Sequence, residues 1–444
     1  MIVNVHYYIL DSFFLGCDLI DFLQLSIPFK SEHVMQVLSA DEKGGYYINL
    51  EEIARRAGLC LCSRNVEFQI DGDLEVSALS HPYESLPSHF SSLAMKVHQG
   101  SNLSPPRVEL KASPAKLLQG HNVFGPTDVC LCAQSLLEPF VLAMPLLYEF
   151  LDIEETCIAK IDSTFSARLK TINQTRQVMD LLRNVSNGQT KATKNTRSQN
   201  YDTTMYWNET SNSVRRKAYL KGQELQADLD RCKLAFRRSP NDASLKRRIN
   251  VLSNPDLIEW AALIVRFEVS LFPRKLNELN IPIKLIDLIK YQYEYEKEGR
   301  NLIYDMWSAG FNELFESFKG SIMNIYDDEK ILELLKSKYH SITPKGNITY
   351  AKAQRIFGFY RRLVNEGYDE VFKTFNRASF YRNIDELMAV GISKAQLQNL
   401  QADKLSNVIP LVDIIRVDFS QQYPDWYVEP VCPSYDNIVQ LKAS

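Results

Sequence analysis

A tyrosine, a lysine and a glutamate lie within six residues of one another in a basic part of the sequence. Tyr219, Lys221 and Glu224 follow a cationic run at 215–217. A tyrosine hydroxyl among cations and carboxylates suits attack on a phosphodiester, which would leave a phosphotyrosyl intermediate. A DNA strand could be broken in this way while the bond energy needed to reseal it is kept. Since the ordinary pKa of tyrosine is about 10, only about 0.1% of the hydroxyl is ionised at neutral pH, so the site must activate it.

Further cations and carboxylates alternate on two expected strands. Lys160 and Asp162 are two residues apart on one, and Arg266 and Glu268 are two apart on the other. Side chains two apart in a strand share a face, so each pair projects from one side of the sheet. They are either cross-strand ion pairs on a solvated face or part of a functional site, where charge interrupts the ordinary apolar pattern.

Carboxylates of this kind could hold Mg²⁺ or Mn²⁺, hard cations that prefer oxygen ligands and act as Lewis acids on a phosphate. A nearby lysine would stabilise the charge that develops in the transition state. The seven histidines include no His-x-His sequence. We therefore do not expect the histidine-rich metal site of many nicking enzymes. Glu224 lies where a strand is expected to give way to a helix, so the pattern does not fix its direction.

The charge of the chain is unevenly distributed. The net charge is −3, yet residues 168–248 contain 18 Lys and Arg against 7 Asp and Glu. Aromatic residues such as Tyr206 are interleaved with these cations, which suits a nucleic acid because phosphates bind the cations and bases stack on the rings. The alternative is a solvated loop and helix face. We expect Arg215, Arg216 and Arg266 to contact DNA.

A helix start near residue 113 is another candidate phosphate contact. Ser113 and Pro114 are typical of a helix N-terminus, whose free N–H groups could bind phosphate together with Lys116 on the first turn. The alternative is a structural cap with a solvated lysine. His121 could orient a ligand or be a buried, hydrogen-bonded histidine.

A helix beginning near residue 377 reads like the second helix of a helix-turn-helix motif. Arg377 and Arg382 lie toward its N-terminal end, whereas Phe380, Ile384 and Leu387 would form its buried stripe. We expect the two arginines to contact DNA. Plain helical packing is the alternative.

Length and composition indicate a globular protein of two or three domains. The chain has 444 residues, of which 45% are apolar and 24% charged,. The best apolar run, 140–151, contains Pro145 and Glu149 and is far short of a membrane span of about 18 residues. The N-terminus has no basic leader, so we expect a cytoplasmic protein. The eight cysteines are expected to be reduced, mostly buried thiols, because the two Cys-x-Cys pairs lack zinc-site spacing and nearby histidines,.

Strands and turns dominate the first 160 residues, and helices dominate the end of the chain. A hairpin is expected at 66–78. Other strands are expected at 108–112, 158–165, 205–207, 217–221 and 265–271, and other helices at 134–151 (interrupted at Pro145), 174–183, 225–236 and 256–264,. Beyond Pro282 the apolar spacing is helical at 284–299, 303–319, 329–338, 351–375, 379–390 and 393–402.

This change of period predicts an α+β fold. A β-rich catalytic domain with helices would span 1–280, followed by a helical connector at 281–322. An all-helical DNA-binding domain would span 323–444.

Several long runs resemble the replication initiators of filamentous phages, of the gene II protein type. They are 107–125, 161–168, 182–190, 206–210, 218–221, 265–268, 323–328, 357–362, 393–400 and 424–427. The resemblance covers nearly the whole chain and implies a Rep-type nuclease. The first forty residues, the spacer at 191–217 and the last dozen residues diverge.

The resemblance implies a site-specific endonuclease and strand-joining enzyme for rolling-circle replication. Such an enzyme nicks the plus strand of supercoiled duplex DNA at the origin, frees a 3′-hydroxyl for the host polymerase and later recircularises the displaced single strand. It implies that Tyr219 is the nucleophile, with Lys221 beside it. A shorter similarity to plasmid initiators of the Rep-trans type implies that Asp162, Glu224 and Glu268 hold Mg²⁺ or Mn²⁺.

The same resemblance implies partners and a second product. Duplex and single-stranded origin DNA, the host helicase and the host DNA polymerase would be partners in the host bacterial cytoplasm, without a membrane; an oligomer on DNA stays open. An internal start at Met323 would yield a shorter DNA-binding regulator. The alternative is a non-catalytic origin-binding protein that recruits host replication factors. It would not need Tyr219, Asp162 or Glu268.

Overall fold

The fold was obtained as a computed structural model. It describes residues 19–37, 44–68, 74–184, 203–316, 328–342, 347–392, 394, 396–398, 400 and 422–430. The turn expected within the 66–78 hairpin, the proposed start at Met323 and half of the helix expected at 393–402 lie outside them.

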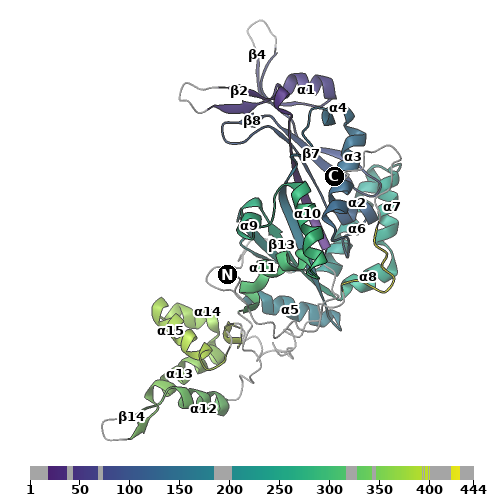
Figure 1. Ribbon diagram of the computed structural model, residues 1–444. Coiled ribbons are helices and arrows are strands. Elements are labelled where there is room, and N and C mark those ends of the chain that lie inside the picture. Colours follow the sequence, from purple (N-terminus) through teal and green to yellow (C-terminus); the bar gives the residue numbers. More distant parts are fainter. Residues whose placement is uncertain are drawn as a thin grey trace.

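An eight-stranded antiparallel sheet forms the centre of the molecule (Figure 1). In spatial order its strands are β11 (Thr204–Trp207), β12 (Val214–Leu220), β13 (Ile264–Leu271), β10 (Cys157–Arg168), β1 (Leu19–Pro28), β9 (Arg107–Ala112), β7 (Ser92–His98) and β6 (Glu84–Pro87). Every residue of β13 is buried, so this strand lies in the interior although it carries Arg266 and Glu268.

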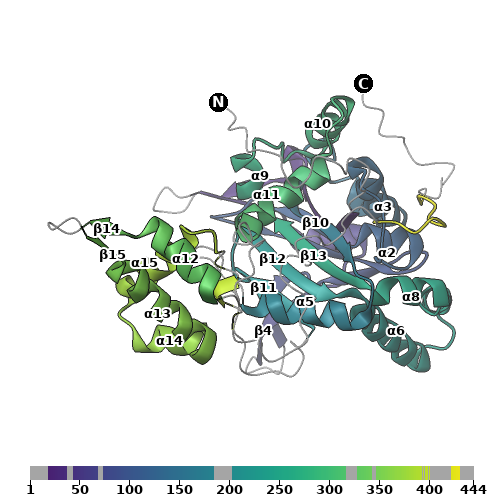
Figure 2. The ribbon, with the colours of Figure 1, turned by 90° about the horizontal axis from the view of Figure 1, so that it is seen from below.

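The two faces of the sheet have different chemistry because side chains alternate along each strand. On one face, Phe267 of β13 packs edge-on against Phe311 of α11 (Leu302–Glu316). Figure 2 shows α11 near β12 and β13. The opposite face of β13 carries Arg266 and Glu268, and these residues face the site described below.

The other helices around the sheet follow in chain order. They are α1 (Leu50–Ala57), α2 (Pro114–Gln119), α3 (Val129–Ala143), α4 (Pro145–Tyr148), α5 (Ile172–Asn184), α6 (Lys221–Arg238), α7 (Ala243–Leu252), α8 (Pro255–Ala262), α9 (Pro273–Glu278) and α10 (Leu285–Lys297). Helices α6, α7 and α8 share a small apolar core with Val123 and Phe124.

Short strands extend one end of the sheet. They are β2 (Met35–Val37), β3 (Gly45–Tyr47), β8 (Gly100–Ser101) and the hairpin strands β4 (Cys62–Phe68) and β5 (Leu74–Ser80), with a 3₁₀ turn at Ser31–His33. The hairpin strands pair antiparallel.

The C-terminal helices have an apolar core of their own. They are α12 (Asp328–Lys338), α13 (Ala351–Glu366), α14 (Tyr368–Thr374) and α15 (Arg377–Met388), with a two-stranded ribbon of β14 (Ser341–Ile342) and β15 (Ile348–Thr349). The single helix expected at 351–375 is wrong, because Gly367 has φ +90°, outside the helical range, and divides α13 from α14,.

The α+β class and the helical C-terminal region are confirmed. Helices α10 and α11 contribute Leu285, Leu288, Ile303, Met306 and Trp307 to the apolar core of the sheet. They therefore pack with the sheet, although the sequence suggested a connector; the domain boundaries stay a prediction. The six described cysteines are free thiols, but only Cys132 and Cys232 are buried, which corrects the expectation of mostly buried thiols. Among the described residues, no helix has the length and hydropathy of a membrane span.

Candidate active site

A pocket of about 630 Å³ opens on the charged face of the sheet. It brings together residues from neighbouring strands and from two helices that follow strands. Its polar lining includes Asp21, Ser113, Lys116, Asn122, Lys160, Asp162, Tyr206, Arg215, Arg216, Lys217, Tyr219, Glu224 and Glu268. Most of the residues singled out from the sequence thus meet in one place.

Tyr219 lies near the end of β12, opposite Arg266 of β13. The side chain is almost fully buried, with 6% of its surface exposed, and its hydroxyl donates a 3.4 Å hydrogen bond to Glu268 Oε2. Burial raises the pKa of Tyr219 well above 10, and the nearby carboxylates of Asp21 and Glu268 raise it further. The phenol is therefore protonated at neutral pH and needs a base or a cation before it can attack.

Lys221 begins α6 directly after β12, so its side chain returns toward the sheet. The side chain is fully buried, and Nζ donates to Asn122 Oδ1 at 2.7 Å and to Glu224. Burial lowers the pKa of Lys221 to about 8, partly opposed by Glu224. The close approach of helices here requires a glycine: a Cβ on Gly222 would lie 2.8 Å from the Ala262 Cα at the end of α8.

Asp21 and Glu268 form a carboxyl pair in the pocket. Burial, together with the negative charges of Asp21 and Asp162, raises the pKa of Glu268 to about 8, although Lys217 Nζ lies 2.7 Å from Glu268 Oε1. Burial also acts to raise the pKa of Asp21, but nearby cations and a hydrogen bond from Glu268 hold that pKa well below its usual range. One proton is therefore shared between two carboxyl groups near the Tyr219 hydroxyl.

Asp162 has one oxygen committed and one available. Its Oδ2 accepts a 2.8 Å hydrogen bond from Lys160, whereas the buried Oδ1 has no partner among the described residues. Glu224, in contrast, accepts from both Lys221 and Lys116. Within the described part of the chain, no three His, Cys, Asp or Glu side chains are grouped closely enough to hold a metal ion. The features that fit a hard divalent cation are the free oxygen of Asp162 and the crowded pair of Asp21 and Glu268.

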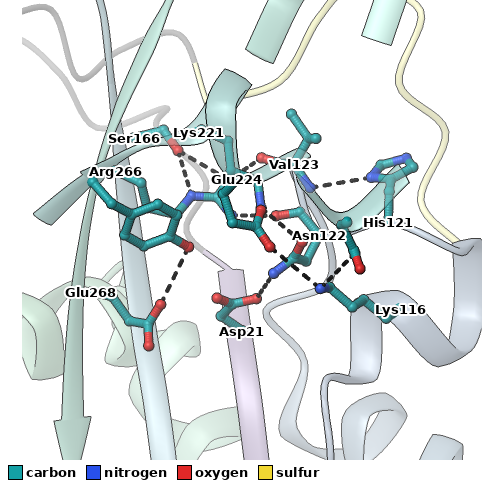
Figure 3. A network of polar contacts seen from close by, with 12 residues as sticks. Asp21, Lys116, His121, Asn122, Val123, Ser166, Lys221, Glu224, Arg266 and Glu268 are labelled. Atoms are coloured by element: carbon teal, nitrogen blue, oxygen red, sulfur yellow. Dashed lines mark hydrogen bonds and ion pairs between the residues drawn. The ribbon is translucent and has the colours of Figure 1, made fainter. Parts of the chain in front are cut away.

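Arg266 is not available to DNA, which corrects the expectation from its charge. Its guanidinium is fully buried and donates to the backbone carbonyls of Asn122 and Val123 and to Ser166 Oγ (Figure 3). The arginine therefore holds the 121–125 loop against the sheet. Arg216 is also buried, and its Nε donates to the carbonyl of Gly310, so it has little freedom to reach a phosphate.

His121 was expected either to orient a ligand or to be a buried, hydrogen-bonded histidine, and the second alternative describes its environment. Its Nδ1 accepts a 3.2 Å hydrogen bond from the Val123 N–H, and burial lowers the pKa of the ring to about 3. A neutral ring that does not line the pocket is no phosphate contact. Lys116, Ser113 and Arg215 do line it, and Ser113 Oγ is buried without a partner among the described residues.

The C-terminal helix α15 has the expected apolar stripe. Phe380, Ile384 and Leu387 are buried in the C-terminal core, and Arg377 and Arg382 are exposed. Both arginines are therefore accessible, and their contact with DNA stays a prediction.

Two residues of the site were not singled out from the sequence. Asp21 is the only charged residue in the apolar run 19–27, a signal that could have indicated it. Asn122 joins the two halves of the site, because its Nδ2 donates to Asp21 Oδ1 at 2.6 Å while its Oδ1 accepts from Lys221 (Figure 3). No local pattern indicates such a bridge.

The chain is similar to known proteins over most of its length. The family model for the N-terminal part of the filamentous-phage replication-associated protein, the gene II protein, matches residues 19–298, and the model for its C-terminal part matches 342–433. The chain is 50% identical over 430 residues to the replication-associated protein of Salmonella phage IKe, covering 96% of this chain and 100% of that protein. It is also 50% identical over 414 residues to the replication-associated proteins of Enterobacteria phages fd and M13, covering 93% of this chain and 99% of each.

A solved structure of a rolling circle replication initiator protein from Geobacillus stearothermophilus matches 57% of this chain and 74% of its own, at 11% identity and a TM-score of 0.23. That similarity is too low to carry an argument. The assignment to a family rests on the sequence matches, which extend over both the sheet and the C-terminal helices. The chain therefore belongs to the family of gene II replication-associated proteins of filamentous phages.

Proposed function

We propose that this protein nicks the plus strand of supercoiled phage DNA at the replication origin and later recloses the displaced strand into a circle. The observation that carries the proposal is the position of Tyr219: its hydroxyl lies in a pocket whose lining also includes Lys116, Arg215 and Lys217. Cations bind the phosphates of a DNA strand, and a tyrosine among them can reach the phosphorus. Membership in the gene II protein family supports the same function.

In the proposed nicking step, the Tyr219 oxygen attacks the phosphorus of the scissile phosphodiester. The bond from phosphorus to the 3′ oxygen breaks, that oxygen takes up a proton as a free 3′-hydroxyl, and the 5′ phosphate stays on Tyr219. In the closing step a 3′-hydroxyl attacks the phosphotyrosyl bond and releases the tyrosine. The number of phosphate bonds is unchanged, so neither step needs an energy source.

The surrounding residues have distinct roles in this scheme. Glu268 is the nearest acceptor for the Tyr219 proton and can accept it only as a carboxylate, which the adjacent Lys217 favours. Lys221, held by Asn122 and Glu224, places a positive charge beside the tyrosine ring, with Nζ 5.8 Å from its centre. That charge would stabilise the phosphorane-like transition state.

Mg²⁺ or Mn²⁺ is the proposed cofactor, and the buried Asp162 Oδ1, which has no partner among the described residues, supports the proposal. When bound, it would supply Lewis acidity at the phosphate and favour the ionised forms of the carboxyl groups. Asp162 and Glu268 are the proposed ligands, as the sequence suggested. Asp21 is better placed than Glu224 as a third, because two lysines already neutralise Glu224.

The DNA would reach the pocket along the cations that line it. Lys116, Ser113 and Arg215 are the proposed phosphate contacts, and Arg377 and Arg382 of α15 would add contacts from the C-terminal region. The free 3′-hydroxyl is a substrate for a host DNA polymerase, and strand displacement requires a host helicase. These host proteins are the proposed partners.

The experiment that tests the function compares two tyrosines of the same pocket. Tyr219→Phe removes one oxygen and a weak hydrogen bond, so the fold should be retained while nicking, closing and a covalent protein–DNA adduct are all lost. Tyr206→Phe is the matched control, because Tyr206 also lines the pocket. Nicking of supercoiled origin plasmid is measured with and without Mg²⁺, and the adduct is detected under denaturing conditions. Nicking by Tyr219→Phe at the parental rate would refute the assignment.

The same assay tests the non-catalytic alternative. An origin-binding protein that only recruits host factors would retard origin DNA on a gel but leave the supercoiled plasmid intact, with or without the metal ion. It would also be indifferent to the loss of the Tyr219 hydroxyl.

A further inference from the structure

The segment 422–430, near the C-terminal end of the chain, packs on the sheet body. In Figure 2 this segment, drawn in yellow, lies far from the helices α12–α15 that precede it in sequence. Gln422 is buried and the segment contributes Tyr423 and Tyr427 to the apolar core of α6, α7 and α8. The segment therefore packs on α6, α7 and α8 and not on the separate apolar core of the C-terminal helices.

Gln422 completes the hydrogen bonding of strand β10. The pairing of β1 with β10 begins at Leu19 opposite Thr164, two residues short of Ser166. There the Gln422 side chain takes the place of a neighbouring strand: its Oε1 accepts from the Ser166 N–H at 2.8 Å, and its Nε2 donates to the Ser166 carbonyl at 2.6 Å. Both buried backbone groups are thereby satisfied.

The aromatic residues of the segment hold the loop at 121–125. Tyr423 donates its hydroxyl to the Gly125 carbonyl at 2.7 Å. Tyr423 and Tyr427 stack with ring centres 4.1 Å apart, and the Tyr427 ring meets Phe124 edge-on at 5.1 Å. Phe124 is buried in this contact. The segment therefore fixes the loop through both a backbone carbonyl and a buried ring.

The clamped loop and strand carry the groups that position the proposed catalytic lysine. Asn122, within the loop, bridges Asp21 and Lys221 with its side-chain amide. Arg266 ties the same loop to β10 by donating to the carbonyls of Asn122 and Val123 and to the Ser166 hydroxyl. The C-terminal segment thus contacts both parts that Arg266 connects: the backbone of Ser166 in β10 and the 121–125 loop.

We propose that Gln422, Tyr423 and Tyr427 are positioning residues of the active site, which clamp the 121–125 loop so that Asn122 holds Lys221 beside Tyr219. The proposal rests on the nicking function proposed above. It assigns a role in catalysis to a segment that lies beyond the helical region, about 200 residues after the nucleophile. A loop displaced by a fraction of an ångström would move Lys221 from the position where the transition state needs it, and such displacements lower turnover more than binding.

The test uses the full chain with substitutions in the segment. Gln422→Ala removes both hydrogen bonds to Ser166, and Tyr423→Phe removes only the hydroxyl that binds Gly125, a change that leaves the fold intact. Asp425→Asn and Val428→Ala, at exposed positions of the same segment, are the controls. Two quantities are measured: the nicking rate as a function of DNA concentration, and hydrogen–deuterium exchange of the peptide covering 120–126.

We expect the nicking rate at saturating DNA to fall between about tenfold and a hundredfold in Gln422→Ala and by less in Tyr423→Phe. The half-saturating DNA concentration should stay within about twofold of the parent. Exchange should accelerate at 120–126, and both controls should behave as the parent. A parental rate with parental exchange would overturn the proposal, and so would a rise in half-saturating DNA at an unchanged rate, which would mean that the segment contacts DNA. A parent that does not nick would refute the proposed function, while parental exchange in the variants would separately refute the clamp.

Discussion

The substitution Asp228→Asn tests how α6 is fixed beside the pocket. Asp228 lies on α6 with 6% of its surface exposed, and its carboxylate contacts Lys116 of α2 at 2.9 Å and Arg248 of α7 at 2.7 Å. Burial acts to raise the pKa of Asp228, but these two cations and Arg231 together lower it from 3.8 to about 2. A pKa difference of this size corresponds to about 2 kcal/mol of folding free energy.

The sign of the pH dependence follows from the direction of the shift. Because the pKa of Asp228 is lower in the folded than in the unfolded state, the carboxylate stabilises the fold fully above about pH 5, and this contribution is lost as the pH falls from about 4 toward 2. We expect Asp228→Asn to lower the free energy of unfolding by about 2 kcal/mol at pH 7 and by about 1 kcal/mol at pH 3.

Urea unfolding followed by circular dichroism measures both values. Asp230→Asn is the matched control, because Asp230 lies on the exposed side of the same helix and is bonded only to Gln226 among the contacts described. It should change stability by less than about 0.5 kcal/mol. The reasoning is refuted if Asp228→Asn is as stable as the parent at pH 7, or if its deficit is the same at pH 3 as at pH 7.

Three further outcomes are expected. Asp162→Asn and Glu268→Gln keep the side-chain size but remove ligand charge, so nicking at limiting Mg²⁺ should fall at least about tenfold while origin binding persists; normal cleavage in a Mg²⁺ titration would exclude that residue as a ligand. Gly222→Ala should lower the free energy of unfolding by about 1–3 kcal/mol, because its Cβ would meet the Ala262 backbone, and a thermal midpoint at or above the parental one would contradict this,. A fragment of residues 323–444 should be helical by circular dichroism and bind DNA without nicking it, with an affinity that falls steeply with salt; no binding at low salt would contradict it.

Local patterns were enough to predict many of the elements that carry the site. The strand at 108–112 and the helix start at Ser113 and Pro114 are both present, because alternation and proline position are properties of a few adjacent residues,. The strand at 158–165 is also present, slightly longer than expected. The site residues expected on these elements, Asp162 and Lys116, accordingly line the pocket.

Asp21 was missed because the alternation breaks at this residue. The register of β1 against β10 shifts between Ile20, opposite Ser163, and Phe22, opposite Asp162, so Asp21 is an extra residue in a bulge. Bulges re-aim side chains and are frequent beside active sites. Here Asp21 and Phe22, adjacent in sequence, both line the pocket, which strict alternation does not allow.

The role of Arg266 was misjudged for a different reason. Its sequence neighbourhood shows that a charge is present but not which acceptors surround it, and two of those acceptors come from residues more than 140 positions earlier. No helix was expected at Ala243–Leu252, where the structure has α7. Long-range contacts of this kind decide whether a buried cation binds a ligand or supports the fold, and the local sequence does not contain them.

The order of the strands determines how long a newly synthesised chain remains incompletely folded. β1 leaves the ribosome well before both of its neighbours, β9 and β10, and Gln422 reaches Ser166 across 256 residues. At a synthesis rate of about 5–20 residues per second, that last contact forms roughly 13–50 s after Ser166 is made. Contacts of such sequence separation also slow folding itself. The backbone of Ser166 in β10 therefore waits for residue 422 to be made, and a chain released before that residue lacks this contact.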